Sequence, residues 1–119
     1  MLYTTFKVKD TEYKLRLTTR AMIDVEKRLG ENPLNIFMKM GKDANGAASE
    51  LPQISTLITI LWGALQPYNH GMNEAAVCDL YDEFVDDGHN LFDLVPIILE
   101  VFKVSGFLQN DTKEDAEKN

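Results

Sequence analysis

The residue types best suited to covalent or metal chemistry are scarce in this chain, which has one cysteine, Cys78, and two histidines, His70 and His89. A cysteine nucleophile needs a histidine base and a group that orients that base, and no motif for either arrangement is present. The spacing also fits no zinc-ligand pattern. Cys78 follows the apolar position Val77, so we expect it to be a small packing residue and both histidines to be solvated. We therefore predict no catalytic or metal site, and keep a small enzyme using Cys78 and a histidine as an alternative.

A second candidate is the acidic segment Asp82–Gly88, which superficially resembles a calcium-binding loop. Its third position is Phe84 and its sixth is Asp87, where such a loop needs an oxygen ligand and a glycine. The pattern instead favours the outer face of a helix. Carboxylates near the C-terminal end of a helix oppose its dipole, which indicates a face that meets a cationic partner. The candidate partner-binding carboxylates are those of Asp79, Asp82, Glu83 and Asp86.

A third candidate is a methionine- and phenylalanine-bearing patch on a short helix that begins at Asn32-Pro33 and ends at Gly41. Methionine adapts to irregular partners, so this patch is a candidate binding surface, with core packing as the competing interpretation. Trp62 has the same ambiguity. No phosphate loop or dinucleotide fingerprint occurs, so no cofactor is expected. The residues of the patch are Leu34, Phe37, Met38 and Met40.

The elements that position these residues are organised around Ile54–Leu65. Its apolar residues recur at helical spacing, and Ile60 adds apolar surface off that face, which predicts a helix covered on several sides. We expect Ser49 to cap this helix, with Pro52 in its first turn.

Before this helix, alternating residues predict an N-terminal β-hairpin of strands Thr5–Val8 and Tyr13–Leu17. Further helices are expected over Arg20–Leu29, capped by Thr18 or Thr19, and over residues 73–87 and 90–105. Val85 is assigned to the buried stripe of the 73–87 helix. Pro96 should kink the last helix or delay its start to about Asp93.

The predicted fold class is therefore mainly α (α+β): a compact bundle of about five helices with a small N-terminal β-hairpin within residues 3–17. The chain of 119 residues suits one domain, expected over residues 1–108 and followed by a polar, flexible tail at 109–119. The net charge of −7 disfavours binding to nucleic acid or to an anionic membrane. No secretory signal is visible at the N-terminus, so a cytoplasmic location is expected.

The run from Tyr13 to Ala21, continuing through Asp24–Gly30 and Asn32-Pro33-Leu34, resembles a known family. The similarity extends through Tyr68–Gly71, Asp79-Leu80-Tyr81 and Ser105-Gly106-Phe107, and spans about residues 3–108. The family is that of the tail assembly chaperones of long-tailed phages and prophages of Gram-positive bacteria.

The resemblance implies a non-catalytic protein that binds the tape-measure protein in the cytoplasm of the infected host and is absent from the mature virion. It also implies a longer frameshifted product that recruits the tail-tube protein. A homo-oligomer is compatible with this function. The alternative is a structural protein of the tail or its connector that stays in the virion.

Overall fold

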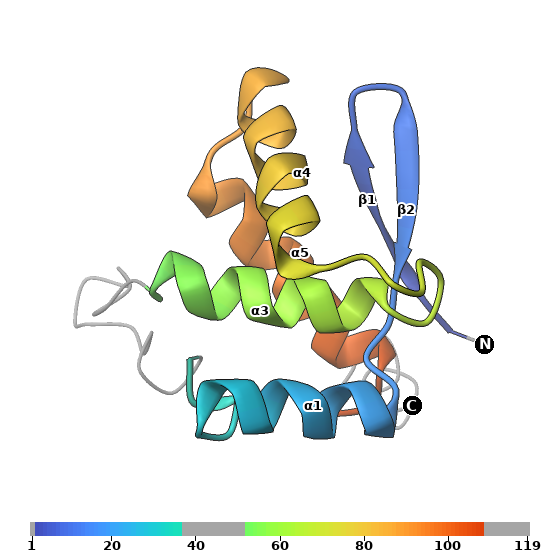
Figure 1. Ribbon diagram of the computed structural model, residues 1–119, viewed down its shortest axis with the longest axis vertical. Helices are drawn as coiled ribbons and strands as arrows, with labels where there is room; N and C mark the ends of the chain where they lie inside the picture. The colour runs from blue at the N-terminus through green and yellow to red at the C-terminus, as the bar shows by residue number, and fades with distance from the viewer. Residues whose placement is uncertain (1, 37–51, 109–119) are drawn as a thin grey trace, which may run out of the picture.

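The computed structural model describes residues 2–36 and 52–108, which form a two-stranded antiparallel hairpin and four helices (Figure 1). The described elements confirm the α+β class and the N-terminal hairpin. They include four of the five expected helices, because most of the short helix expected after Pro33 falls outside the described residues. The tail at 109–119 and Ser49 also lie outside them. The elements in chain order are β1 (Thr4–Val8), β2 (Thr11–Leu15), α1 (Thr19–Leu29), α3 (Ile54–Leu65), α4 (Glu74–Asp86) and α5 (Leu91–Val104).

Helix α3 lies at the centre of the molecule and contacts α1, α4, α5 and β2. Its last nine residues, Leu57 to Leu65, are all buried, including Thr59, whose hydroxyl donates to the Ser55 carbonyl. The expectation of a helix covered on several sides is therefore confirmed. The helix ends at Leu65 as predicted, but its N-cap is Gln53. Pro52 therefore precedes the helix, which begins later than a cap at Ser49 would place it.

Helices α1 and α3 pack closely in the core, where Gly63 faces Val25. A Cβ on Gly63 would overlap Cγ2 of Val25 and crowd Cδ2 of Leu17, so only glycine lets the two helices pack at this spacing. Beside this contact, the Arg28 guanidinium lies 3.7 Å from the centre of the Trp62 ring and pairs with Glu74. Trp62 is buried, so it is a core residue, and one face of its ring is covered by an arginine.

The hairpin packs one face on the helices, with Phe6, Val8 and Leu15 buried. β2 begins at Thr11, two residues earlier than predicted, because only Lys9 and Asp10 form the turn. Lys9 has a φ of 55°, and its N–H donates to the Asp87 carboxylate at 3.1 Å, which joins the hairpin tip to the end of α4.

The helix ends follow local sequence signals. Thr18 and Asn73 accept from backbone N–H groups in the first turns of α1 and α4, and Asn90 and Asp93 form a capping box on α5. Helix α5 therefore begins at Leu91, before Asp93, and continues through Pro96. The carbonyl of Phe92 loses one intrahelical donor there, because proline has no N–H.

Candidate functional site

The four predicted carboxylates of α4 lie together on its outer face. Asp79, Asp82, Glu83 and Asp86 are all exposed, and successive 100° steps place them within about 100° of one another around the helix axis. The opposite face carries Val77, Leu80 and Phe84, which are buried against α3 and β1. This acidic stripe, defined by the four carboxylates, is thus held outward by the packing of the other face.

The stripe is concentrated toward the C-terminal end of α4, where the helix dipole makes negative charge unfavourable. The last turn of α4 contains no basic residue, whereas the last turn of α1 contains Lys27 and Arg28. Asp87, the C-cap residue, accepts a hydrogen bond from Lys9 N–H, but no hydrogen bond or ion pair within the described ranges involves the stripe itself. These carboxylates remain available to a cationic partner.

Valine 85 departs from the predicted pattern. It was assigned to the buried stripe of α4, but its side chain is 43% exposed. It lies about 100° beyond Phe84 on the helix, past the edge of the contact with α3 and β1. An exposed apolar side chain therefore flanks the acidic stripe.

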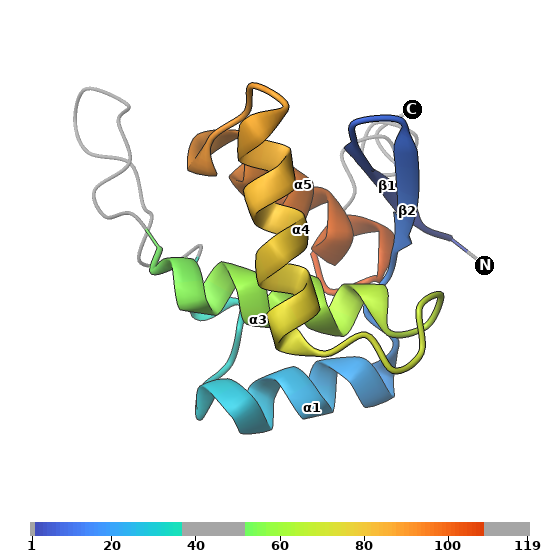
Figure 2. The same ribbon diagram turned by 45° about the horizontal axis from the view of Figure 1, so that its top comes forward.

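The second predicted surface is only partly described. Leu34 is half-buried and packs against the core, and the adjacent Ile36 is buried. Phe37, Met38 and Met40 lie outside the described residues. In both Figure 1 and Figure 2, the segment that follows α1 and the C-terminal turns of α4 lie at opposite ends of the molecule. The described start of the second predicted surface therefore lies away from the last turns of α4.

Cysteine and the two histidines are kept apart by α4. His70 precedes this 13-residue helix and His89 follows it, so the helix, roughly 20 Å long, separates them. Cys78 lies within α4 and is exposed, so the prediction that it is a packing residue is wrong. Val77 occupies the buried position, and the next residue points about 100° away from it. The structure does not assemble a site from these three residues.

Histidine 89 has a defined position because of the way α4 ends. Gly88 adopts a φ of 96°, and the N–H groups of Gly88 and His89 donate to the carbonyls of Val85 and Phe84, which is a Schellman motif. The motif brings the side chain after the glycine onto the last turn. The imidazole of His89 stacks on Phe84 with ring centres 4.4 Å apart, and its Nδ1 lies 3.4 Å from the Asp93 carboxylate.

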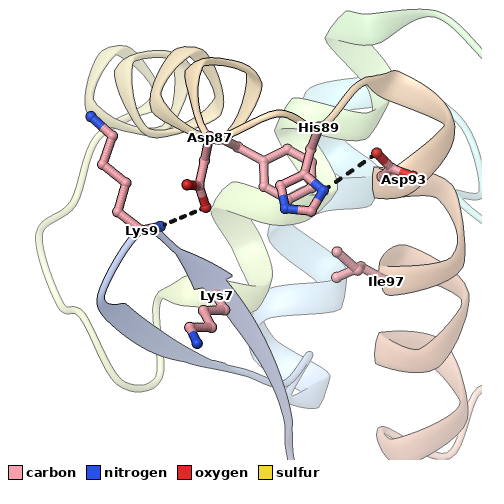
Figure 3. Close-up of a pocket in the computed structure, with 7 residues that line it drawn as sticks. Lys7, Lys9, Asp87, His89, Asp93 and Ile97 are labelled. Atoms are coloured by element: carbon pink, nitrogen blue, oxygen red, sulfur yellow. Dashed lines mark hydrogen bonds and ion pairs between the residues drawn. The ribbon is translucent and has the colours of Figure 1, made fainter.

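An open pocket of about 580 Å³ lies beside His89, between β1, the end of α4 and the start of α5 (Figure 3). Sequence patterns do not predict this pocket, because its residues come from segments that are separated along the chain. The only local signal was Gly88-His89 following Phe84, which is typical of a helix-ending glycine. The pocket combines two cations, two carboxylates, an imidazole and two apolar side chains: Lys7, Lys9, Asp87, Asp93, His89, Phe84 and Ile97.

No cysteine, serine or threonine is among the described residues that line this pocket, so none of them offers a thiol or hydroxyl for His89 to activate. The formal charges of the pocket are balanced, with two lysines and two aspartates among the lining residues. Asp87 and Asp93 also already accept backbone hydrogen bonds, from Lys9 and Asn90 respectively. The arrangement lies between the hairpin, α4 and α5 and forms a recess with charged and apolar sides.

Tyrosine 81 lies beside the acidic stripe on α4, and the pKa of its phenol is raised. Burial raises the pKa of its phenol above the usual value of 10.0, and the negative charges of Asp82 and Asp93 raise it further. The Tyr81 ring also packs against Phe84, with centres 6.2 Å apart. Burial, with a smaller contribution from the charges of Asp82 and Asp93, thus favours the neutral form of the phenol.

Two further kinds of site, metal centres and membrane spans, concern the described ranges 2–36 and 52–108. No group of three or more histidine, cysteine or acidic side chains is arranged to hold a metal ion there. Within the same ranges, each helix is too short or too polar to cross a lipid bilayer.

A comparison with protein-family models matches residues 2–119 to one model, described as a family of unknown function (DUF6096). Because the match covers nearly the whole chain, the protein belongs to that family. No curated protein and no solved structure matches the chain.

Proposed function

We propose that the protein is a non-catalytic binding protein, and specifically a tail assembly chaperone that binds the tape-measure protein of a long-tailed phage. The observation that carries the binding role is the acidic stripe of α4, whose four carboxylates are exposed on one helix face. The resemblance described above supports the more specific assignment.

The residues that carry the resemblance are mostly those that shape turns and caps. Gly30 ends α1 with a φ of 73°, and Asn32 accepts a hydrogen bond from the N–H of Leu34. The Ser105 hydroxyl accepts from the N–H of Leu17 and links the end of α5 to the start of α1. The resemblance therefore concerns residues that determine the fold. The choice of client depends on the exposed surface residues.

The physical argument for the client begins with charge. An exposed acidic stripe at the unfavourable end of a helix loses part of its electrostatic cost when a cationic segment binds. The exposed side chain of Val85 beside it offers apolar contact at the edge of the same face. A largely helical client that presents lysine or arginine beside apolar residues would match this combination.

The direct test is co-expression with the tape-measure protein, expected to be encoded next to this protein. We expect the client to stay in the supernatant only when the chaperone is present, and to co-purify with it. Equal solubility of the client alone would contradict the proposed function.

A variant with Asp79→Asn, Asp82→Asn, Glu83→Gln and Asp86→Asn should weaken the complex by roughly tenfold or more, or about 1.4 kcal/mol. The matched control neutralises four exposed carboxylates elsewhere, at Asp10, Asp24, Glu26 and Glu100. It carries the same net charge, so it should bind the client as the unaltered protein does. Equal loss in both variants would show that total charge, and not the stripe, is responsible.

The second candidate is a structural protein of the tail or connector. Mass spectrometry of purified virions separates the two functions, because a chaperone leaves before maturation. Recovery of this chain in virions, in a fixed ratio to the tail-tube protein, would favour the structural alternative.

A further inference from the structure

The outer edge of β2 presents backbone groups that the hairpin does not use. Strand β1 lies between β2 and helix α4 in both views of Figures 1 and 2, and β1 contacts α4 and α5. β2 therefore forms the outer edge of the two-stranded sheet, away from these helices. An exposed edge strand is a ready site for pairing with another strand.

The hairpin register identifies which residues point outward. The turn has two residues, so Val8 and Thr11 close the ladder as a hydrogen-bonded pair. Such pairs alternate along an antiparallel ladder, so the N–H and C=O groups of Glu12 and Lys14 point away from β1. Arg16 continues this alternation, because its N–H leaves the hairpin and donates to the Ala64 carbonyl at 3.0 Å.

Glu12 and Lys14 have no hydrogen bond outside the hairpin and no ion pair to another part of the described chain. Both residues are exposed. The Lys14 ammonium lies 4.9 Å from the centre of the Tyr3 ring, and 5.7 Å from that of Tyr68, which holds this side chain over the outer face of the sheet. These rings carry no formal charge, so the ammonium remains free to meet a carboxylate.

We propose that β2 pairs with β2 of a second copy of this chain, antiparallel and about a two-fold axis at Tyr13, to form a four-stranded sheet. In this register Glu12 lies opposite the partner's Lys14, and Lys14 opposite the partner's Glu12. Both pairs are of the hydrogen-bonded type, so all four outward backbone groups of each strand gain a partner. This inference is independent of the proposed client.

The charges of Glu12 and Lys14 favour this register over the two registers in which the partner strand is shifted by two residues. A shift of the partner strand by two residues in one direction places Glu12 opposite the partner's Glu12, and in the other places Lys14 opposite the partner's Lys14. Like charges directly opposite each other destabilise a sheet. In the proposed register Glu12 lies between Lys7 of its own hairpin and the partner's Lys14, so charges alternate across three of the four strands, and the fourth strand places an uncharged threonine in this row.

The test is a charge exchange followed by the molar mass in solution, measured by sedimentation from roughly 10 µM to 1 mM, where a small interface associates. The unaltered chain should approach twice its 13.5 kDa mass as concentration rises. Glu12→Lys and Lys14→Glu should each remain monomeric, because each places like charges opposite each other at both pairs. An equimolar mixture of these two variants should recover the dimer, and so should the double variant Glu12→Lys/Lys14→Glu.

The matched controls are Glu26→Lys and Lys27→Glu, which make the same charge changes at exposed positions on α1 and should dimerise as the unaltered chain does. Circular dichroism confirms that each variant is folded. Three results would each overturn the proposal: an unaltered chain that is monomeric throughout, dimers that persist in both single variants, or a mixture that stays monomeric.

Discussion

The contact between α1 and α3 and the outer face of α4 represent two opposite uses of a helix surface. At the first, Gly63 and Val25 approach so closely that a methyl group would not fit, and the surrounding residues are buried. At the second, four carboxylates are exposed at the end of a helix that has no basic residue in its last turn. The first region holds the fold together, whereas the second gives up a little stability and remains available for binding.

The largest expected effect is in the centre of the fold. Leu61→Ala removes a fully buried side chain from α3 and should lower the free energy of unfolding by about 2–5 kcal/mol. Ile54→Ala, on the same helix but 48% exposed, is the control and should cost far less. Urea denaturation measures both, and similar losses would argue against a central α3.

The next effect tests the close approach itself. Gly63→Ala should destabilise the protein by about 1–3 kcal/mol, because its methyl group must displace the side chain of Val25. In a Val25→Ala background the same substitution should cost much less, since the obstructing methyl groups are gone. An unchanged cost in that background would place the strain elsewhere.

A smaller effect, of opposite sign, is expected on α4. Glu83→Gln and Asp86→Asn remove negative charge from its last turn, so each should raise the free energy of unfolding by about 0.3–1 kcal/mol at low salt. Asp24→Asn, in the middle of α1, provides the control and should have little effect. A destabilised α4 variant would mean that these carboxylates make stabilising contacts, which would weaken the comparison.

The smallest effect concerns pH. Because burial and the nearby aspartates raise the pKa of Tyr81, the folded protein keeps this proton at a pH where the unfolded chain loses it. The free energy of unfolding should therefore fall as pH rises above about 10, the ordinary pKa of tyrosine. Thermal denaturation between pH 9 and 11 should show a shallower fall for Tyr81→Phe. Asp82→Asn, which removes the second cause of the shift, should lie between the two.

The sequence by itself determined the features that depend on neighbours along the chain. The apolar stretch of α3, the caps at Thr18, Asn73 and Asn90, and the glycines that end α1 and α4 follow from spacing and short-range hydrogen bonds. The exposed carboxylates of α4 were predicted for the same reason, since helical periodicity fixes which residues share a face.

Only the tertiary structure decided how wide the buried face of each helix is and which other element covers that face. Val85 and Cys78 are exposed because α3 and β1 cover a narrower strip of α4 than its apolar pattern suggests. The pocket beside His89 and the free edge of β2 depend on packing between segments far apart in sequence, such as Lys9 and Asp87. The periodicity of the sequence shows which side chains lie on a face that can be buried. The size and direction of the element that covers this face then determine which of those side chains are buried.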